Sequence, residues 1–447
     1  MINDAQSNIN LIGFIFMVTM GLLVLFLPRR FAVLPIIMAV CFITLGQVIN
    51  VASLHFTVFR IIIFIGFVRV IIRNEISSIR LHTIDKILIA YVITSATAYI
   101  LLRSGSSEAF ISQLGFVFNS LFLYIVFRSL IHDLDDINAI FKMLALIAVP
   151  IAVAMFIEKA TGRNLFSIFG GVPEFTMIRD GKIRAQGAFA HPILAGTFGA
   201  TTLPFMIALW SLSKGKRLIA GLGIISVTMI TVASSSSGPV MTYLVIMVGM
   251  AMWYARDHMR AVRWFILLSL ISLHMVMKAP VWALIGKVSE VIGGGGWHRF
   301  MLIDAAISHF DEWWLLGTDV TRHWMPTGVT WSEKHTDITN QFISVGINGG
   351  FLSLILFIAI IVFCFKNIGM KLKEISSAEF PIKFTIWCIG VSLVGHVASF
   401  TSVHYFDQFI VFWYLLLALI TTISIIPAET LIANTPNDTP NQDRVIP

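Results

Sequence analysis

Long apolar runs separated by short polar segments make up most of the chain. Each run is about 18 or more residues long and almost free of charge, the length that a helix needs to cross roughly 30 Å of hydrocarbon. A membrane barrel would instead show short segments of alternating polarity. We therefore predict an all-α, polytopic membrane helix bundle with about 12–13 transmembrane helices. The predicted spans are 10–28, 31–50, 56–73, 84–102, 109–128, 137–157, 189–211, 217–234, 239–255, 261–277, 342–366, 383–401 and 406–426.

The composition agrees with a chain embedded in a membrane. Of the 447 residues, 57% are hydrophobic and only 12% are charged, whereas charged residues make up roughly 25% of a soluble domain. The cysteines, Cys41, Cys364 and Cys388, all lie inside apolar runs. Their spacing favours packing roles over a disulfide framework or a zinc site.

Basic residues are distributed unevenly over the short loops. The segment with Arg29 and Arg30 and the segments 73–86, 214–217, 255–263 and 366–374 hold Lys and Arg, and they alternate with loops that hold almost none. Because basic loops stay cytoplasmic, we expect the N-terminus outside and the C-terminus inside. The net charge of +7 then follows from topology rather than from an anionic partner.

Two long polar loops fall on the outer side of this topology, at 158–188 and 278–341. They divide the chain into an N-terminal transmembrane bundle (1–157), a central region with both loops (158–366), C-terminal transmembrane helices (367–427) and a polar, proline-rich tail (428–447) that we expect to be disordered and cytoplasmic. The second loop is rich in tryptophan, which favours a folded structure at the membrane interface. Its segment "RFMLIDAAISHFDEWW" predicts a helix after Gly293–Gly296.

The first long loop contains a cluster of basic residues just before a predicted span. Arg179, Lys182 and Arg184 lie within six residues and could bind a pyrophosphate, because guanidinium groups bind phosphate oxygens bidentately. They could equally be interfacial anchors. Arg184 is the stronger site candidate because the small residues of "AQGAFAHP" follow it, while His191 is expected to cap or pack.

The second long loop offers candidates for acid–base chemistry. His335 has an imidazole suited to act as a general base, and Asp337 follows at a distance that would let it fix the tautomer. The alternative is a solvated loop histidine. The segment "HFDEWW" could suggest a metal bound by His309, Asp311 and Glu312, but this spacing matches no strong metal-ligand template, so no metal is predicted.

Two other classes of function are less consistent with the pattern. A proton-coupled transporter would keep carboxylates near the bilayer midplane, and the apolar runs hold none near their centres. The serines at 234–237 lack the context of a nucleophile, so capping of a helix end is the simpler role.

Several short motifs resemble those of the O-antigen ligase and Wzy-type polysaccharide polymerase superfamily. Ligases of that family carry a histidine followed by Asn, Ser or Gln, nine residues, and Gly-x-x-Gly before Thr-Thr. Here His335 and Thr336 precede nine residues and then Gly346 and Gly349, with Gly350 and Phe351 in place of the threonine pair. The motif Arg-x-x-x-Leu is matched by Arg299, with isoleucine in the leucine place. The segment "RAQGAFAHPILAG" resembles the family's second arginine motif.

The resemblance implies a GT-C-like, metal-independent glycosyltransferase that needs no cofactor and acts at the periplasmic face of a bacterial inner membrane. Its donor would be an undecaprenyl-diphosphate-linked glycan. Its acceptor would be another glycan if the enzyme is a polymerase for surface polysaccharide or exopolysaccharide, or lipid A-core or a protein if it is a ligase. A lipid-linked oligosaccharide flippase is the alternative from another class. The site residues implied are His335 and Asp337 for catalysis, and Arg184, Arg299, Arg179 and Arg322 for the diphosphate.

Overall fold

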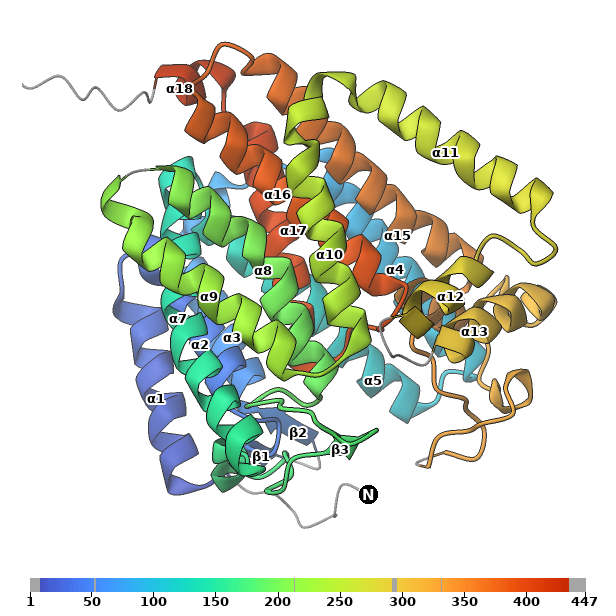
Figure 1. Ribbon diagram of the computed structural model, residues 1–447. Coiled ribbons are helices and arrows are strands. Elements are labelled where there is room, and N and C mark those ends of the chain that lie inside the picture. The colour runs from blue at the N-terminus through green and yellow to red at the C-terminus, as the bar shows by residue number, and fades with distance from the viewer. Residues whose placement is uncertain (1–8, 52–53, 213, 292–295, 331, 434–447) are drawn as a thin grey trace, which may run out of the picture.

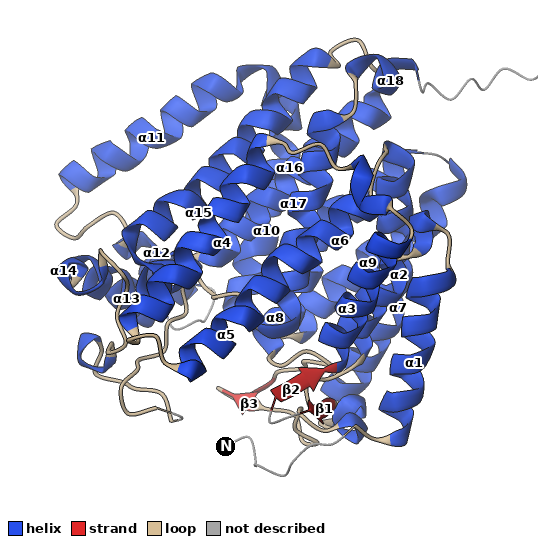
Figure 2. Cartoon of the chain, turned by 180° about the vertical axis from the view of Figure 1, so that it is seen from behind, coloured by secondary structure: helices blue, strands red, loops and turns tan. Residues whose placement is uncertain are grey.

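The computed structural model describes residues 9–51, 54–212, 214–291, 296–330 and 332–433 of the chain. In this part the chain is an all-α bundle with two small hairpins (Figure 2). The earlier helices are α1 (Leu11–Phe26), α2 (Val33–Phe42), α3 (Val58–Ile72), α4 (Thr83–Leu102), α5 (Ser107–Val117), α6 (Leu123–Leu130), α7 (Leu134–Thr161), α8 (Pro192–Leu212) and α9 (Arg217–Ala233). The later helices are α10 (Ser237–Ala251), α11 (Met259–Val276), α12 (Ala283–Val291), α13 (Gly296–Ser308), α14 (Phe310–Trp313), α15 (Gln341–Glu374), α16 (Phe380–Phe400), α17 (Ile410–Ile425) and α18 (Ala428–Ala433).

The strands form two antiparallel hairpins beside the loops. Strand β1 (Val48–Val51) pairs with β2 (Leu54–Thr57), and β3 (Ile178–Arg179) pairs with β4 (Lys182–Ile183). Figure 1 shows β1, β2, β3, α12 and α13 toward the lower end of the bundle, while α18 lies at the upper end. The two long loops of the sequence therefore share one end of the molecule.

The prediction of a membrane-embedded helix bundle is confirmed in its coarse form. In the described part of the chain, eight helical segments are long and apolar enough to cross a membrane, and α1 and α9 are apolar but shorter. This is fewer than the 12–13 predicted from the runs. The predicted span at 31–50 was wrong, because α2 ends at Phe42 after 10 residues and is about 15 Å long. Gly46 beyond it lies so close to the first long loop that a Cβ there would be 2.5 Å from the Gly170 backbone.

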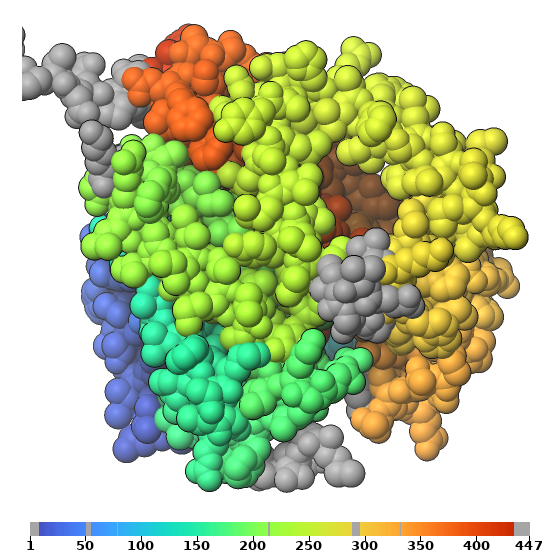
Figure 3. Space-filling model, viewed as in Figure 1, coloured from blue at the N-terminus to red at the C-terminus, as the bar shows by residue number. Residues whose placement is uncertain are grey.

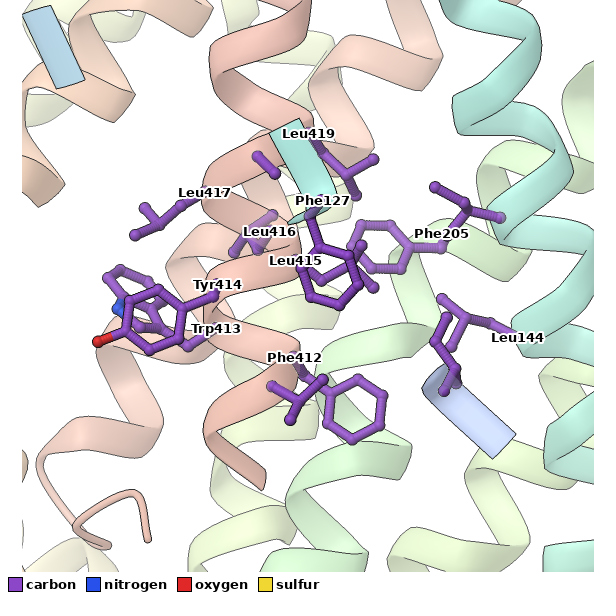
Figure 4. Packing of buried hydrophobic residues seen from close by; sticks show 14 of the residues in the cluster. Phe127, Leu144, Phe205, Phe412, Trp413, Tyr414, Leu415, Leu416, Leu417 and Leu419 are labelled. Atoms are coloured by element: carbon purple, nitrogen blue, oxygen red, sulfur yellow. The ribbon is translucent and has the colours of Figure 1, made fainter. Parts of the chain in front are cut away.

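Helix α17 runs through the middle of the bundle (Figure 4). It is buried on every side over Val411–Ile423, as expected of a helix that is hydrophobic all round. Figure 4 shows Phe412 and its neighbours on α17 beside Phe127 of α6, Leu144 of α7 and Phe205 of α8. Segments from both halves of the sequence therefore share one core.

Ion pairs and hydrogen bonds join loops that the sequence places on the cytoplasmic side. Arg29 and Arg30 both contact the carboxylate of Asp136 at the start of α7. The Nζ atom of Lys371 near the end of α15 donates to the carbonyl of Ile426 after α17, at 3.0 Å. These contacts put basic loops at one end of the bundle, consistent with the predicted alternation; which side of a membrane that end faces stays a prediction.

Helix α11 stands apart from the other helices. None of its residues, Met259–Val276, is buried, and Figure 2 shows it separated from the bundle along most of its length. The space-filling view shows a hollow between α10 and α11, with C-terminal helices visible at its floor (Figure 3). The surface of α11 is apolar, with Phe265 and Val276 mostly exposed.

Candidate functional site

The turn between α9 and α10, Ser234–Ser237, is the meeting point of three cationic side chains. We call it the serine turn. The cations come from the end of α7, from the first long loop and from α13. The bonds are Lys159 Nζ to Ser235 Oγ at 2.5 Å, Arg184 Nη2 to Ser236 Oγ at 2.7 Å, and Arg299 Nη2 to Ser237 Oγ at 3.3 Å. Consecutive serine hydroxyls thus each accept a hydrogen bond from a different cation.

Arg184 is held at the serine turn by buried backbone contacts. The N–H of Ala185 donates to the carbonyl of Ala233 at 3.1 Å, which fixes the loop against the end of α9. The buried carboxylate of Glu158 accepts from the N–H of Gln186 and from that of Gly187 at 2.8 Å. These backbone N–H groups are therefore satisfied inside the protein, as buried backbone groups must be, and Arg184 is only 6% exposed.

Arg299 reaches the same turn from the second long loop. It lies on α13, and its guanidinium lies near the first turn of α10, where a Cβ at Gly238 would be 3.5 Å from Nη2. The neighbouring His298 has its Nε2 atom 2.9 Å from the backbone carbonyl of Asp337. Helix α13 therefore links the serine turn to the segment that carries His335.

Burial and neighbouring charges shift the pKa values of the side chains around the serine turn. Burial lowers the pKa of Arg184, and so does the nearby charge of Arg179, which outweighs the opposite influence of Asp180. Burial lowers the pKa of Arg299 as well, again with a contribution from Arg179. Burial together with Arg184 and Arg179 lowers the pKa of His191 to about 4. Arginine stays protonated despite such shifts, so Arg184 and Arg299 each keep a positive charge at the serine turn.

His191 itself caps a helix. Its Nδ1 atom accepts from the N–H of Ile193 at 3.1 Å, at the start of α8. The expectation that it caps or packs is therefore consistent with its contacts. Its low pKa keeps the imidazole neutral near pH 7, as an acceptor at Nδ1 requires.

His335 lies in the second long loop, half-buried. Its Nδ1 atom is 2.6 Å from Ser332 Oγ, and its backbone carbonyl accepts from the N–H of Val329 at 3.3 Å. An open hollow of about 460 Å³ lies beside this segment. It is lined by Arg322, Gly328, Val329, Thr330, Ser332 and Glu333.

Arg322 lies with His335 rather than at the serine turn. Its guanidinium donates to the carbonyls of Met325 and Pro326, at 2.8 and 3.3 Å, and its backbone N–H donates to the carbonyl of Lys334 at 3.0 Å. These bonds shape the loop in front of His335. The side chain of Asp337 is exposed, and its role in orienting His335 stays a prediction.

A small apolar core holds the second long loop on the bundle. Trp313 and Trp324 are buried there against the loop-facing side of α15, and a Cβ at Gly346 would lie 2.6 Å from the Trp313 ring. The remaining members are Leu302, Ala305, Ala306, Met325, Ile343 and Ile347. The prediction of a folded, tryptophan-rich loop with a helix after the glycines agrees with this core; Trp297 and Trp314 are exposed, and Gly293–Gly295 and Trp331 lie outside the described residues.

The same loop supplies hydrogen bonds to α15 where that helix is interrupted. The backbone of Gly350 is non-helical, with φ +75° and ψ 178°. Across the break, Phe351 N–H donates to the carbonyl of Trp314 at 2.7 Å, and Thr318 N–H donates to the carbonyl of Ile347 at 2.8 Å. The second long loop thus joins α15 at the break at Gly350.

A polar and aromatic cavity of about 280 Å³ lies on another side of α15, among α4, α5 and α17. It combines aromatic rings such as Tyr91 and Tyr99 with the amides of Gln113, Gln341 and Asn348. Rings and hydrogen-bonding groups together suit a ligand with apolar faces and polar edges.

The structure brings two of the predicted site residues into one cluster. Arg184 and Arg299 meet at the serine turn, with Arg179 close enough to influence both electrostatically. His335 is joined to the cluster through α13, and Arg322 supports His335. Sequence reasoning missed Glu158, Lys159 and the serine turn, because each acts through partners distant in sequence. A run of four serines between two spans was the one available signal.

Neither a known protein-family model nor a curated protein sequence matches this chain.

Proposed function

We propose that the chain is a membrane glycosyltransferase of the O-antigen ligase and polymerase type. In this proposal it takes a glycan from an undecaprenyl diphosphate at the periplasmic face and transfers it to an acceptor hydroxyl. The observation that carries the proposal is the convergence of Lys159, Arg184 and Arg299 on the serine turn.

Three features of this cluster favour a diphosphate as its ligand. The guanidinium groups of Arg184 and Arg299 present planar donors that match phosphate oxygens. The Nε atom of Arg184 is buried and has no hydrogen-bond partner among the described residues. Helix α10 begins at Ser237, so the positive end of its dipole adds to the field of the two arginines.

In the proposed reaction, the two arginines bind the diphosphate and His335 acts on the acceptor. The bond between the anomeric carbon and the phosphate oxygen breaks, and a new bond forms from that carbon to the acceptor oxygen. The imidazole of His335 takes the proton of the acceptor hydroxyl. The growing charge on the departing diphosphate is stabilised by Arg184 and Arg299, which are already in place before the bond breaks.

The apolar surfaces of the molecule suit a lipid donor. The hollow between α10 and α11 opens sideways (Figure 3), and α10 starts at the serine turn. A polyprenyl chain lying in this hollow along α10 would bring its diphosphate to that turn. The acceptor glycan is assigned to the polar and aromatic cavity that includes Tyr91 and Tyr99.

Transfer by the purified chain tests the proposal. With an undecaprenyl-diphosphate glycan as donor, Arg184→Lys and Arg299→Lys should each lower kcat/KM by roughly 10²–10³-fold, as loss of a charge-stabilising donor does. An ammonium keeps the charge but not the planar fork. Arg163→Lys is the matched control, because its side chain in the same loop is 67% exposed and pairs only with Glu174 among the ion pairs described. Full transfer by both site variants would argue against diphosphate binding at the serine turn.

A deletion strain separates the remaining functions. Single-repeat glycans on the acceptor would indicate a lost polymerase, whereas long chains left on the lipid carrier would indicate a lost ligase. If the His335→Ala variant fully restores normal glycans in the deletion strain, both the polymerase and the ligase proposals are wrong. A flippase then explains the results better.

A further inference from the structure

Two histidines and a glutamate gather in the second long loop, away from the serine turn. His309 lies between α13 and α14, Glu312 lies on α14, and His323 lies on a short 3-10 helix at Arg322–Trp324. The Oε1 atom of Glu312 is 2.9 Å from His309 Nδ1 and 2.9 Å from His323 Nε2. The sequence suggested Asp311 as a third partner; the fold supplies His323 instead.

We propose that His309, Glu312 and His323 bind a divalent zinc ion that fastens the second long loop. Two imidazole nitrogens and a carboxylate oxygen form a ligand set that zinc prefers, with a fourth position left for water. Ligand atoms around a tetrahedral zinc lie roughly 3.4 Å apart when the bonds are about 2.1 Å. The three atoms here all lie within 4.8 Å of one another, so small side-chain rotations bring them to that spacing.

The surroundings fix these side chains in the orientation that a metal needs. The indole N–H of buried Trp324 donates to Glu312 Oε2 at 3.0 Å. The ring of His309 stacks on that of Trp324, with an interplanar angle of 4° and a centroid distance of 5.6 Å. Partners that orient metal ligands are a regular part of metal sites. The side chains of His309 and His323 are 33% and 47% exposed, which leaves an entry path from solvent.

Among the described residues, Glu312 on α14 contacts the 3-10 helix through His323 and Trp324, and a metal here would add a further link between these segments. Residues 321–324 pair directly with the segment that leads to His335, through Thr321 N–H to Lys334 carbonyl at 2.9 Å and Thr336 N–H to Thr321 Oγ1 at 3.1 Å. The zinc would therefore fasten this segment to α14. Binding is independent of the transferase proposal, because none of the three ligands belongs to the serine turn.

Zinc stoichiometry in the full-length protein tests the site. The untagged chain in detergent is stripped with a chelator, dialysed against Zn²⁺ in a competing chelator, and analysed for bound metal. The wild type should hold one more zinc per chain than His323→Ala and Glu312→Gln. Trp324→Phe should weaken binding by roughly 10–100-fold, the effect of losing a partner of a ligand. His55→Ala is the control, since this exposed histidine lies in the hairpin of β1 and β2 and its loss should leave binding unchanged.

A second variant guards against misfolding. His323→Cys keeps a ligand atom at the position, so Co²⁺ added to it should give a thiolate-to-cobalt charge-transfer band that the wild type lacks. Zn²⁺ should also raise the Tm of the wild type but not that of Glu312→Gln. Equal zinc content in the wild type, His323→Ala and Glu312→Gln, or no such band in folded His323→Cys, overturns the proposal.

Discussion

The two long loops are held on the bundle by opposite means. The first is fixed by buried polar contacts, such as those from Glu158 to the backbone before α8, and its Arg184 is almost completely enclosed. The second is fixed by an apolar core around Trp313 and Trp324, while His335 and most of its ionisable side chains stay partly exposed. Buried polar networks set geometry closely, because each misplaced group costs free energy. In the function that we propose, the first loop would provide the anion site and the second would bring His335 to it.

The largest effect is expected when the proposed general base is removed and the serine turn is left unchanged. His335→Ala should lower kcat for transfer by roughly 10²–10⁴-fold, the range for loss of a general base. Its affinity for the lipid-linked donor should stay unchanged, because the serine turn is intact. Single-turnover kinetics and donor-binding measurements on the same preparation check both halves. If donor affinity fell together with kcat, both loops would take part in donor binding. The division into a binding loop and a reactive loop would then be wrong.

Next in size is a loss of stability in the first loop. Glu158→Gln replaces the carboxylate that accepts from Gln186, Gly187 and Thr176. Hydrogen bonds to charged groups contribute about 1.5–3 kcal/mol each, and we expect the free energy of unfolding to fall by about 3 kcal/mol. Denaturant or thermal unfolding in detergent measures it.

Glu174→Gln is the matched control in the same loop. Its carboxylate is 59% exposed and pairs with Arg163 at 3.9 Å. The change in stability should stay within about 0.5 kcal/mol, as is usual for surface substitutions. Equal losses in the two variants would mean that the loop is not anchored by Glu158.

A smaller effect is expected where the second loop meets α15. Gly350→Ala puts a side chain on a residue with φ +75° and against the carbonyl of Leu315. Backbone strain of this kind costs about 1–3 kcal/mol. Gly369→Ala in the same helix is the control: a Cβ there meets nothing within 4 Å, so it should be neutral or stabilise by up to about 1 kcal/mol. Unfolding measurements on both variants compare their stabilities. If Gly350→Ala is as stable as the wild type, the kink at Gly350 does not hold the second loop on α15.

The positions of most helices could be predicted from the sequence, but several contacts of the candidate side chains could not. Apolar runs predicted most helices, and the small residues after Arg184 and the spacing from His335 to Gly346 pointed to the two loops. Hydropathy could not show that α2 ends at Phe42, because the close approach of Gly46 to Gly170 depends on the folded loop. Nor could spacing show that His323 lies beside Glu312, since a turn and a buried Trp324 bring them together.

The break in α15 has a consequence for how the molecule is made. The break leaves the carbonyl of Ile347 and the N–H of Phe351 without partners inside the helix, and Thr318 and Trp314 bond to them instead. Both of these residues precede α15 in the chain and are therefore synthesised before it. Unsatisfied peptide groups are costly in a lipid environment. We expect the extramembrane segment to fold first and act as a template on which the following helix acquires its bend during insertion.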